Sequence, residues 1–164
     1  MDGFHFTKAQ LRQQATIKGM QPDKVMLRRG AHWTFDSTNF VNTIRILQSK
    51  PDSTHHLPSF DHAVGDPVAD DITIRPHHHI VLLEGIYLHL SISPWNEIKL
   101  LVDELWWVEP RSKVTSSNRL AKRHFNAGLS DSIAAAEQRI INNDLPNSTF
   151  TEENRFPPSR TIFN

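Results

Sequence analysis

The chain has 164 residues, with 18 basic and 18 acidic side chains, ten histidines and no cysteine. This length suits one domain with a hydrophobic core, and the balanced charge gives no reason to expect nucleic acid or an anionic membrane as a partner. The lack of cysteine excludes disulfides and thiolate metal sites, and every apolar run is far shorter than the roughly 20 residues of a membrane-spanning helix. Because the first residues also lack the layout of a secretory signal, we expect a soluble, cytoplasmic protein.

The N-terminal part of the chain predicts three helices. Thr7 and Gln10 match the capping box that begins a helix, and Gly19 can end that helix. A second, short helix is predicted over 22–29, where a proline stands in the first turn and a glycine follows the end. Asp36 then precedes "STNFVNTIRILQ", whose apolar residues recur at helical spacing and predict the third helix.

The amino-acid composition changes in the middle of the chain. Residues 49–79 are rich in Pro, Asp, Ser and His, which indicates a long loop with one short strand at "DITIR". The following "HIVLLEG" at 79–85 is apolar on both faces and predicts a buried strand of a parallel sheet. A helix over 93–102 and a strand over 104–109 come next. This order of strand, helix and strand favours an α/β fold in which helices cover the sheet.

Two acidic residues are the first candidates for chemistry. Glu84 ends the apolar run and precedes Gly85, so it would project from the carboxyl end of a parallel strand, where ligands bind in open α/β sheets. Its carboxylate could hold Mg²⁺, or it could simply face solvent. Asp2 is either a solvated charge near the start of the chain or, beside Glu84, a group that accepts a proton from a substrate hydroxyl.

The stretch "RRGAHWTFD" at 28–36 combines arginines, aromatic residues and an acid. Trp33 and Phe35 could form an apolar wall, and Asp36 could accept hydrogen bonds from the paired hydroxyls of a sugar. Asp36 is an equally good N-cap for the helix that follows, and both interpretations stay open.

Further along, the acidic stretch "LPSFDHAVGDPVADD" at 57–71 is either a substrate-contacting loop or a solvated turn, because its spacing does not fit a calcium loop. The "HHH" at 77–79 defines no third metal ligand. None of the six glycines belongs to G-x-x-x-x-G-K-[ST] or G-x-G-x-x-G, so the sequence contains no loop of the kind that cradles phosphates.

The C-terminal part predicts two helices, "SSNRLAKRHFNAG" and "SDSIAAAEQRIINND", followed by a polar tail. Arg119 and Arg123 stand four residues apart on one face of the first of these helices, with Lys122 close by. Three cations on one helical turn suit a chain of phosphates, although solvated basic helix faces are also common.

Several of these stretches, taken in order, resemble the uridine kinase and phosphoribulokinase-like P-loop kinases, in the branch that is similar to nucleoside, sugar and pantothenate kinases. The resemblance runs from residue 1 to about residue 163 and rests on "MDGFH", "RRGAHWTFD", "SFDHAVGDP", "VLLEGIYLHL", "NRLAKRH" and "RIINND". It implies an α/β fold with a parallel sheet flanked by helices, in a single domain over 1–164 with lid helices at about 113–144. It also implies an enzyme that uses ATP and Mg²⁺ to transfer the γ-phosphoryl group to a hydroxyl of a nucleoside-, sugar- or pantothenate-like acceptor.

The resemblance also implies a role for each candidate residue. Asp2 matches the proposed catalytic base, and Glu84, also catalytic, matches the acidic residue that ends the Walker-B-like strand and helps to hold Mg²⁺. The basic lid helix that closes over ATP corresponds to Arg119, Lys122 and Arg123. The acceptor site would be formed by His5, Arg29, Trp33, Asp36, Phe60 and Asp61.

In related kinases a strand, a phosphate-binding loop and a helix precede the equivalent of "MDGFH". We therefore expect the first strand and the phosphate loop to be missing here, so that ATP and Mg²⁺ bind only once that loop is restored and the chain as written is inactive. A second departure is His32, where related sequences tend to have proline. The alternative to a kinase belongs to another functional class: a non-catalytic protein whose acceptor pocket binds a metabolite or a partner without turnover.

Overall fold

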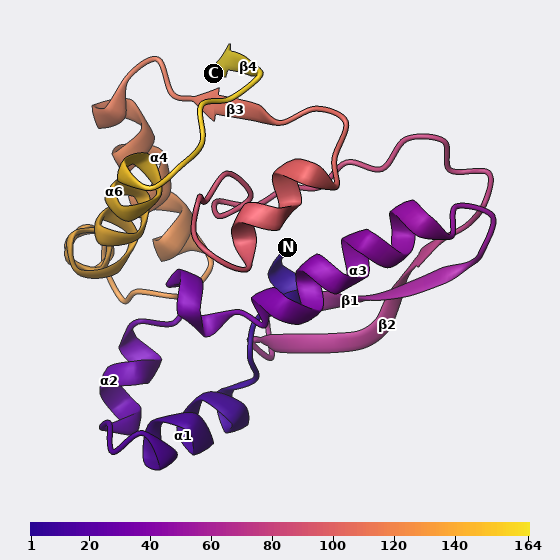
Figure 1. Cartoon of the computed structure of the whole chain (residues 1–164). Helices are drawn as coiled ribbons and strands as arrows, with labels where there is room; N and C mark the ends of the chain where they lie inside the picture. The colour runs from indigo at the N-terminus through magenta and orange to yellow at the C-terminus, as the bar shows by residue number, and fades with distance from the viewer. The chain divides into compact units, whose positions relative to one another are not determined.

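The computed structural model describes residues 1–164, which divide into two compact units, Met1–Val102 and Asp103–Asn164. Both units are drawn in Figure 1, where the first runs from indigo to pink and the second from orange to yellow. None of the helices combines the length and the apolar character that crossing a membrane requires. The helices predicted at about 113–144 all lie in the second unit.

The first predicted helix is confirmed as α1 (Lys8–Ile17). Its capping box is complete, because the Gln10 N–H donates to the Thr7 hydroxyl at 3.1 Å and the Thr7 N–H donates to the Gln10 side-chain oxygen at 2.8 Å. Gly19, which follows the helix, has φ +65°, a conformation that costs little without a Cβ.

The next two predicted helices are also confirmed. Helix α2 (Pro22–Leu27) has proline in its first turn. Helix α3 (Ser37–Ser49) begins at Asp36, whose carboxylate accepts the Asn39 N–H at 3.0 Å. Local capping chemistry therefore sets the start of α3.

The prediction of a long loop over 49–79 is wrong, because this region forms a β-hairpin. Strand β1 (His55–Asp61) pairs antiparallel with β2 (Asp66–Ile74), and the register shifts between Leu57 and Ser59. The predicted short strand at "DITIR" overlaps the end of β2, which stops one residue earlier, at Ile74. Backbone hydrogen bonding between the two strands overrides a composition that is typical of loops.

The predicted strand over 79–85 is also wrong. These residues are assigned to no strand, and the backbone of 80–83 makes no hydrogen bond. The Ile80 side chain is 81% exposed and the Leu82 side chain is 91% exposed. A parallel strand needs backbone partners from distant segments, and no segment of the described chain pairs with this one.

The core of the first unit is a cluster of aromatic rings. The ring centroids of Phe4 and Phe40 are 4.9 Å apart, and those of Phe40 and Trp95 are 5.8 Å apart. Tyr87 is fully buried, packs on Trp95 at 5.6 Å and donates its hydroxyl hydrogen to the Gly30 carbonyl at 2.6 Å.

The first unit also contains three 3₁₀ helices, two of which carry a ring of this cluster. They are η1 (Asp2–Phe4), η2 (His32–Thr34) and η3 (Trp95–Leu100). The last of them lies inside the helix that the sequence predicts over 93–102. The segments η1 and η3 each carry a buried ring, Phe4 and Trp95. Packing of these rings holds the two segments in the core, because 3₁₀ helices this short have few hydrogen bonds of their own.

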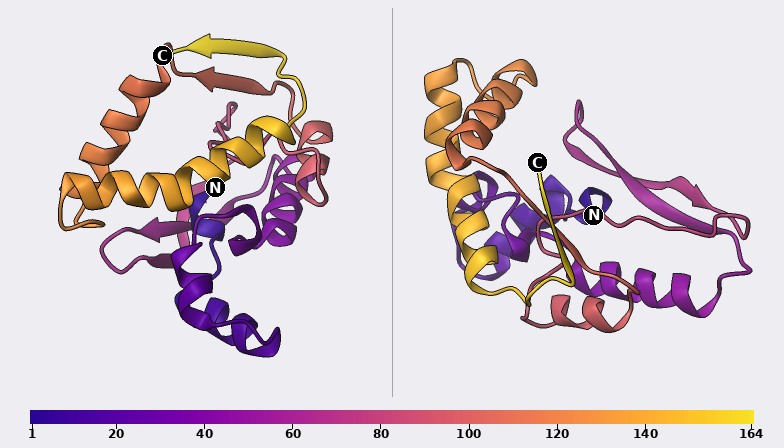
Figure 2. Two further views of the ribbon diagram at one scale, coloured as in Figure 1. Left: turned by 90° about the vertical axis from the view of Figure 1, so that its left-hand side faces the viewer. Right: turned by 90° about the horizontal axis from the view of Figure 1, so that it is seen from above.

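The second unit contains a parallel pair of strands and a helical hairpin. Strand β3 (Trp106–Glu109) pairs with β4 (Arg160–Phe163), and both arrows point the same way in the left view of Figure 2. The strand predicted over 104–109 and the parallel sheet are thus confirmed. The end of the chain, expected to be a polar tail, instead supplies β4.

The helices of the second unit are α4 (Lys113–Asn126), α5 (Ile133–Arg139), the π-helical segment η4 (Ile140–Asp144) and α6 (Leu145–Glu153). The last three follow one another without a break. Helix α5 and segment η4 pack on α4 through a small core of Ala121, Ala136 and Ile140. The His124 side chain, only 9% exposed, also contacts Asp144, with 3.0 Å between Nε2 and the carboxylate oxygen.

Replacing Thr7 by alanine removes the hydroxyl that caps α1. We expect Thr7→Ala to lower the free energy of unfolding by about 1 kcal/mol in urea denaturation, as lost N-caps usually do. The exposed Thr54, outside any helix, supplies the control, and Thr54→Ala should change stability by less than about 0.5 kcal/mol. Equal effects of the two substitutions would show that the capping box does not stabilise α1.

Candidate functional site

Two of the sequence motifs, "MDGFH" and "RRGAHWTFD", lie side by side in the first unit. His5 and Phe35 form an isolated antiparallel bridge. On either side of it, the Phe6 N–H donates to the Thr34 carbonyl at 2.9 Å and the Asp36 N–H donates to the Phe4 carbonyl at 2.8 Å. This backbone pairing fixes the position of Asp2 and His5 relative to Asp36.

Gly3 allows the first motif to approach the hairpin closely. A Cβ at this position would overlap the carbonyl group of Pro58 and approach that of Ser59. Because Gly3 separates Asp2 from the buried Phe4, this close contact holds the Asp2 backbone against β1.

His5 lies between two aromatic rings. Its ring centroid is 3.9 Å from that of Phe35 and 5.0 Å from that of Phe60. Nδ1 lies 2.9 Å from the Asp2 carbonyl oxygen, so this nitrogen carries the proton and donates it. Burial lowers the pKa of His5 below its usual 6.5, and the bond to Asp2 offsets part of that shift.

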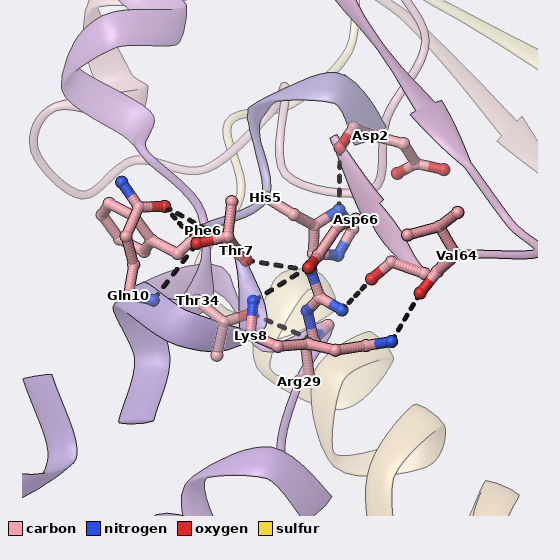
Figure 3. Close-up of polar contacts among 12 residues, drawn as sticks. Asp2, His5, Phe6, Thr7, Lys8, Gln10, Arg29, Thr34, Val64 and Asp66 are labelled. Atoms are coloured by element: carbon pink, nitrogen blue, oxygen red, sulfur yellow. Dashed lines mark hydrogen bonds and ion pairs between the residues drawn. The ribbon is translucent and has the colours of Figure 1, made fainter. Parts of the chain in front are cut away.

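Arg29 connects three segments of the first unit (Figure 3). Its guanidinium donates to the Asp66 carboxylate, with 2.7 Å between Nη2 and Oδ1, and to the Phe6 carbonyl at 2.9 Å. It also donates to the Gly65 carbonyl. The same Asp66 oxygen accepts the Lys8 N–H at the start of α1, at 2.9 Å. The turn between β1 and β2 is thereby held against the N-terminus of α1.

Asp66 is not among the site residues that the sequence predicts, although its carboxylate binds both the Arg29 guanidinium and the Lys8 N–H. Its partner Arg29 stands 37 positions away in the sequence. Only the folded chain brings the two together, so the acidic composition of 57–71 could indicate that carboxylates gather there but not which one is bound.

Phe60 and Asp61 have different surroundings at the end of β1. The Phe60 ring lies under the Arg29 guanidinium, with 5.6 Å from its carbon to the ring centroid. The Asp61 carboxylate accepts the N–H groups of Ala63 and Val64, at 2.7 and 3.1 Å, and so shapes the turn to β2. Phe60 therefore borders the site, whereas Asp61 forms the turn beside it.

A cavity of about 350 Å³ brings Asp2 and Glu84 together. The Met1 terminal ammonium donates to the Glu84 carbonyl at 2.8 Å, which ties the residue before Asp2 to the Glu84 backbone. We call the polar lining residues, together with Phe60, the polar mouth; they are Asp2, Ser59, Phe60, His62 and Glu84. Most of the remaining lining is apolar and is called the apolar groove; it includes Phe40, Ile44, Leu47, Leu57, Ile72, Ile74, Val81, Leu82 and Leu83.

Of the predicted acceptor-site residues only Phe60 lines this cavity, and the other five do not: His5, Arg29, Trp33, Asp36 and Asp61. Trp33, 39% exposed, lines a separate hollow of about 150 Å³ together with residues of α1 such as Gln14. Asp36 caps α3, which is the role that the sequence left open beside sugar binding. The structure thus brings together Asp2, His5, Arg29 and Phe60, and it leaves Trp33 apart from them.

The three predicted lid cations belong to the second unit. Arg119, Lys122 and Arg123 are exposed on α4, and none of them forms an ion pair. Their clustering on one helical turn is as the sequence predicts.

The chemical groups at the polar mouth suit a metal ion and a hydroxyl compound. Asp2 and Glu84 offer carboxylate oxygens, the ligands that Mg²⁺ takes while keeping several waters. No three His, Cys, Asp or Glu side chains of the chain are grouped closely enough to hold a metal by themselves. The residues present fit a Mg²⁺ shared with a bound substrate, but they include no glycine-rich loop for the phosphates.

Comparison with known proteins gives the family. No protein-family model matches the chain. The ATP-dependent kinase-like protein notR' of Aspergillus versicolor is 38% identical over 165 residues, which cover 99% of this chain and 92% of that protein. A candidate uridine kinase of Schizosaccharomyces pombe is 37% identical over 96% of this chain and 65% of its own length. The ATP-dependent kinase YFH7 of Zygosaccharomyces rouxii is 30% identical over 99% of this chain and 49% of its own.

Solved structures agree with this result. A candidate fructose transport system kinase from Silicibacter sp. TM1040 matches 99% of this chain and 72% of its own, with a TM-score of 0.83 and 26% identity. YFH7 from Saccharomyces cerevisiae, a candidate P-loop kinase with a circular permutation, matches 100% of this chain and 56% of its own, with a TM-score of 0.85 and 28% identity.

The fold is therefore that of the α/β P-loop kinases. The chain belongs to the uridine kinase-like family of these proteins, as the resemblance of its motifs predicts. It spans nearly the whole of one curated relative but only about two thirds and one half of the other two.

The Arg29–Asp66 ion pair provides a test of the site's framework. The two side chains are only 13% and 26% exposed, so Asp66→Asn leaves a largely buried guanidinium without its anion. We expect the free energy of unfolding to fall by about 2 kcal/mol in urea denaturation. The exposed pair Arg45–Glu97 supplies the control, and Glu97→Gln should cost at most about 0.5 kcal/mol. A loss no larger than the control's would contradict the role given to Asp66.

His5 provides a test by pH. Since its pKa is lowered in the folded chain, the unfolded chain binds more protons as the pH falls below the usual 6.5. The contribution of His5 to stability is therefore complete above pH 6.5 and declines below it. We expect NMR titration to give His5 a pKa below 6.5, and His5→Asn to weaken the loss of stability at acidic pH. The exposed His79 serves as control, and a His5 that titrates at or above 6.5 would contradict its burial.

Proposed function

We propose that this chain carries the acceptor side of an ATP-dependent kinase site, at which the γ-phosphoryl group of ATP passes to a hydroxyl of a small molecule. The observation that carries the proposal is the position of Asp2 and Glu84 at the polar mouth of one cavity. Membership of the P-loop kinases supports it, because phosphoryl transfer asks the protein mainly for positioning and for neutralisation of charge.

Three residues of the polar mouth and the neighbouring His5 each have a part in this proposal. The Asp2 carboxylate accepts the proton of the acceptor hydroxyl as that oxygen becomes the nucleophile. Glu84 holds Mg²⁺, which when bound neutralises phosphate charge. Phe60 supplies an apolar face for the body of the acceptor, while His5 holds the Asp2 backbone through its Nδ1–H.

The basic face of α4 would act on the phosphates of ATP. Arginine forks match phosphate oxygens, and lysine adds a mobile charge, so Arg119, Lys122 and Arg123 suit a helix that neutralises the triphosphate. This part of the proposal concerns the second unit alone and depends on no particular placement of that unit.

The acceptor class follows from the chemistry and from the relatives. A carboxylate beside an aromatic ring suits a nucleoside, a free sugar or a pantothenate-like compound, all of which join hydroxyls to an apolar or planar part. Among the relatives, one is named as a candidate uridine kinase and one as a candidate fructose transport system kinase, which keeps nucleosides and sugars in this class.

A second function is favoured by one specific observation. The sequence contains neither form of the glycine-rich phosphate loop. A protein that binds an acceptor-like metabolite or a partner without turnover would need only the polar mouth. The two functions differ in nucleotide binding, since only the kinase requires saturable binding of Mg²⁺–ATP.

Turnover of a chain to which the phosphate-binding loop has been restored, with Mg²⁺–ATP and a panel of uridine, fructose and pantothenate, tests the proposal, with products identified by mass spectrometry. In that restored kinase, Asp2→Asn should lower kcat about 100-fold or more with little change in the KM for ATP, because the base is lost and the nucleotide contacts remain. Glu84→Gln should raise the Mg²⁺ concentration needed for half-maximal rate.

The exposed Asp23 on α2 supplies the control, and Asp23→Asn should leave the rate unchanged. Binding of an acceptor without any phosphorylated product and without saturable nucleotide binding would favour the second function. Full turnover in Asp2→Asn would contradict the assignment of Asp2 as the base.

A further inference from the structure

Helices α1 and α2 form a small arm of the first unit with a core of its own. Leu11 and Ala15 of α1 and Val25 of α2 are buried against one another, and Phe6 and Met26 pack on them. In Figure 1 the two helices project away from α3 and the β1–β2 hairpin. We call residues 7–33 the helical arm. Because its buried residues cover one another, its exposed side chains are available for contacts outside the unit.

The helical arm contains the hollow of about 150 Å³ at which the structure places Trp33. Its lining consists of Gln14, Ala15, Lys18, Met20, Val25 and Trp33. Three of these residues, Lys18, Met20 and Trp33, are exposed, so the hollow is open to solvent. A cavity of this volume is large enough to hold benzene. The hollow therefore has the size of one large apolar side chain.

Large apolar side chains remain in contact with water on this arm. Trp33 is 39% exposed and Met20 is 46% exposed, while Ile17 and Leu27, at the ends of α1 and α2, are 77% and 71% exposed. Tryptophan and methionine are enriched at protein interfaces, and the flexible methionine side chain adapts to the shape of a partner. Exposed apolar groups gathered on one short segment indicate a surface that a partner covers.

The helical arm is basic, although the whole chain has no net charge. Residues 7–33 contain six lysines or arginines and a single acid, Asp23. Arg12, Lys18 and Lys24 are exposed, and none of them forms an ion pair. Complementary charge speeds the encounter of two partners and disfavours partners of the same sign. The arm is therefore suited to a negatively charged partner.

We propose that the hollow of the helical arm is a docking site for an acidic peptide segment, which inserts one large apolar side chain into it. The inserted side chain covers Trp33 and Met20, and acidic residues beside it pair with Lys18. A flat anionic membrane would meet the outermost side chains and leave the hollow unfilled. Nucleic acid strands stack successive bases on several aromatic rings, whereas the hollow has only that of Trp33. The proposal goes beyond phosphoryl transfer and does not depend on it.

Titration of the isotope-labelled full chain with a synthetic peptide, followed by NMR, tests the proposal. The probe is a short peptide in which one phenylalanine is flanked on both sides by glutamates, and the matched control peptide has alanine in place of the phenylalanine. We expect the phenylalanine peptide to shift the indole N–H signal of Trp33 and the amide signals of Gln14 and Lys18. The alanine peptide should bind about tenfold or more weakly, because it loses the burial of the aromatic ring.

Two charge reversals show whether the helical arm is responsible. Lys18 is exposed, so Lys18→Glu should leave the fold intact and weaken binding of the phenylalanine peptide about fivefold or more, because an attraction becomes a repulsion. Lys50, exposed at the end of α3 and outside the hollow, supplies the control. Lys50→Glu changes the net charge of the chain equally and should alter the affinity by less than about twofold.

Four outcomes would overturn the proposal. Equal affinity for the two peptides would show that the hollow receives no side chain, and equal losses in the two variants would show that the arm is not the binding surface. Binding to vesicles of phosphatidylserine and phosphatidylcholine that Lys18→Glu abolishes and the peptide does not compete with would assign the arm to a membrane. A Trp33 signal that shifts as the chain alone is concentrated would assign the hollow to a second copy.

Discussion

The first unit depends on one partly buried ion pair, between Arg29 and Asp66. The Asp66 oxygen that meets the guanidinium also accepts the first N–H of α1, and the guanidinium reaches the carbonyl of Phe6. Helix α1, the turn of the hairpin and the segment after "MDGFH" therefore share one charged centre. Both groups have lost most of their hydrating water, so each charge is stabilised mainly by pairing with the other. This pairing fixes the position of the turn between β1 and β2. The aromatic stack on His5 is built on that framework.

The helices of the first unit could be predicted because their signals are local. Thr7 with Gln10, and Asp36 with Asn39, bond within a few residues, so the sequence alone places the starts of α1 and α3. Strands depend on partners that lie far away along the chain. The polar region over 49–79 pairs with itself and forms a hairpin, whereas the strongly apolar 79–85 has nothing to pair with and forms no strand.

Some features of the candidate site, like some features of the fold, could be predicted from the sequence, and others depend on contacts between residues far apart in the chain. The order of the motifs was enough to associate Asp2 with Glu84, and both residues line the same cavity. No sequence pattern could show that His5 packs between Phe35 and Phe60, or that Asp66 binds Arg29, because these contacts arise only on folding. In the proposed function the two carboxylates act together, Asp2 as the base and Glu84 as the residue that holds Mg²⁺.

The measurement that tests the central claim most directly is a titration of the chain with Mn²⁺, in place of Mg²⁺, followed by NMR. If Asp2 and Glu84 form one metal-binding mouth, paramagnetic broadening should appear first, and together, at the amide signals of these two residues. The adjacent acids Asp70 and Asp71 on β2 should broaden only at higher Mn²⁺ concentration. Broadening that begins at this acidic pair, or that affects Glu84 without Asp2, would contradict the account.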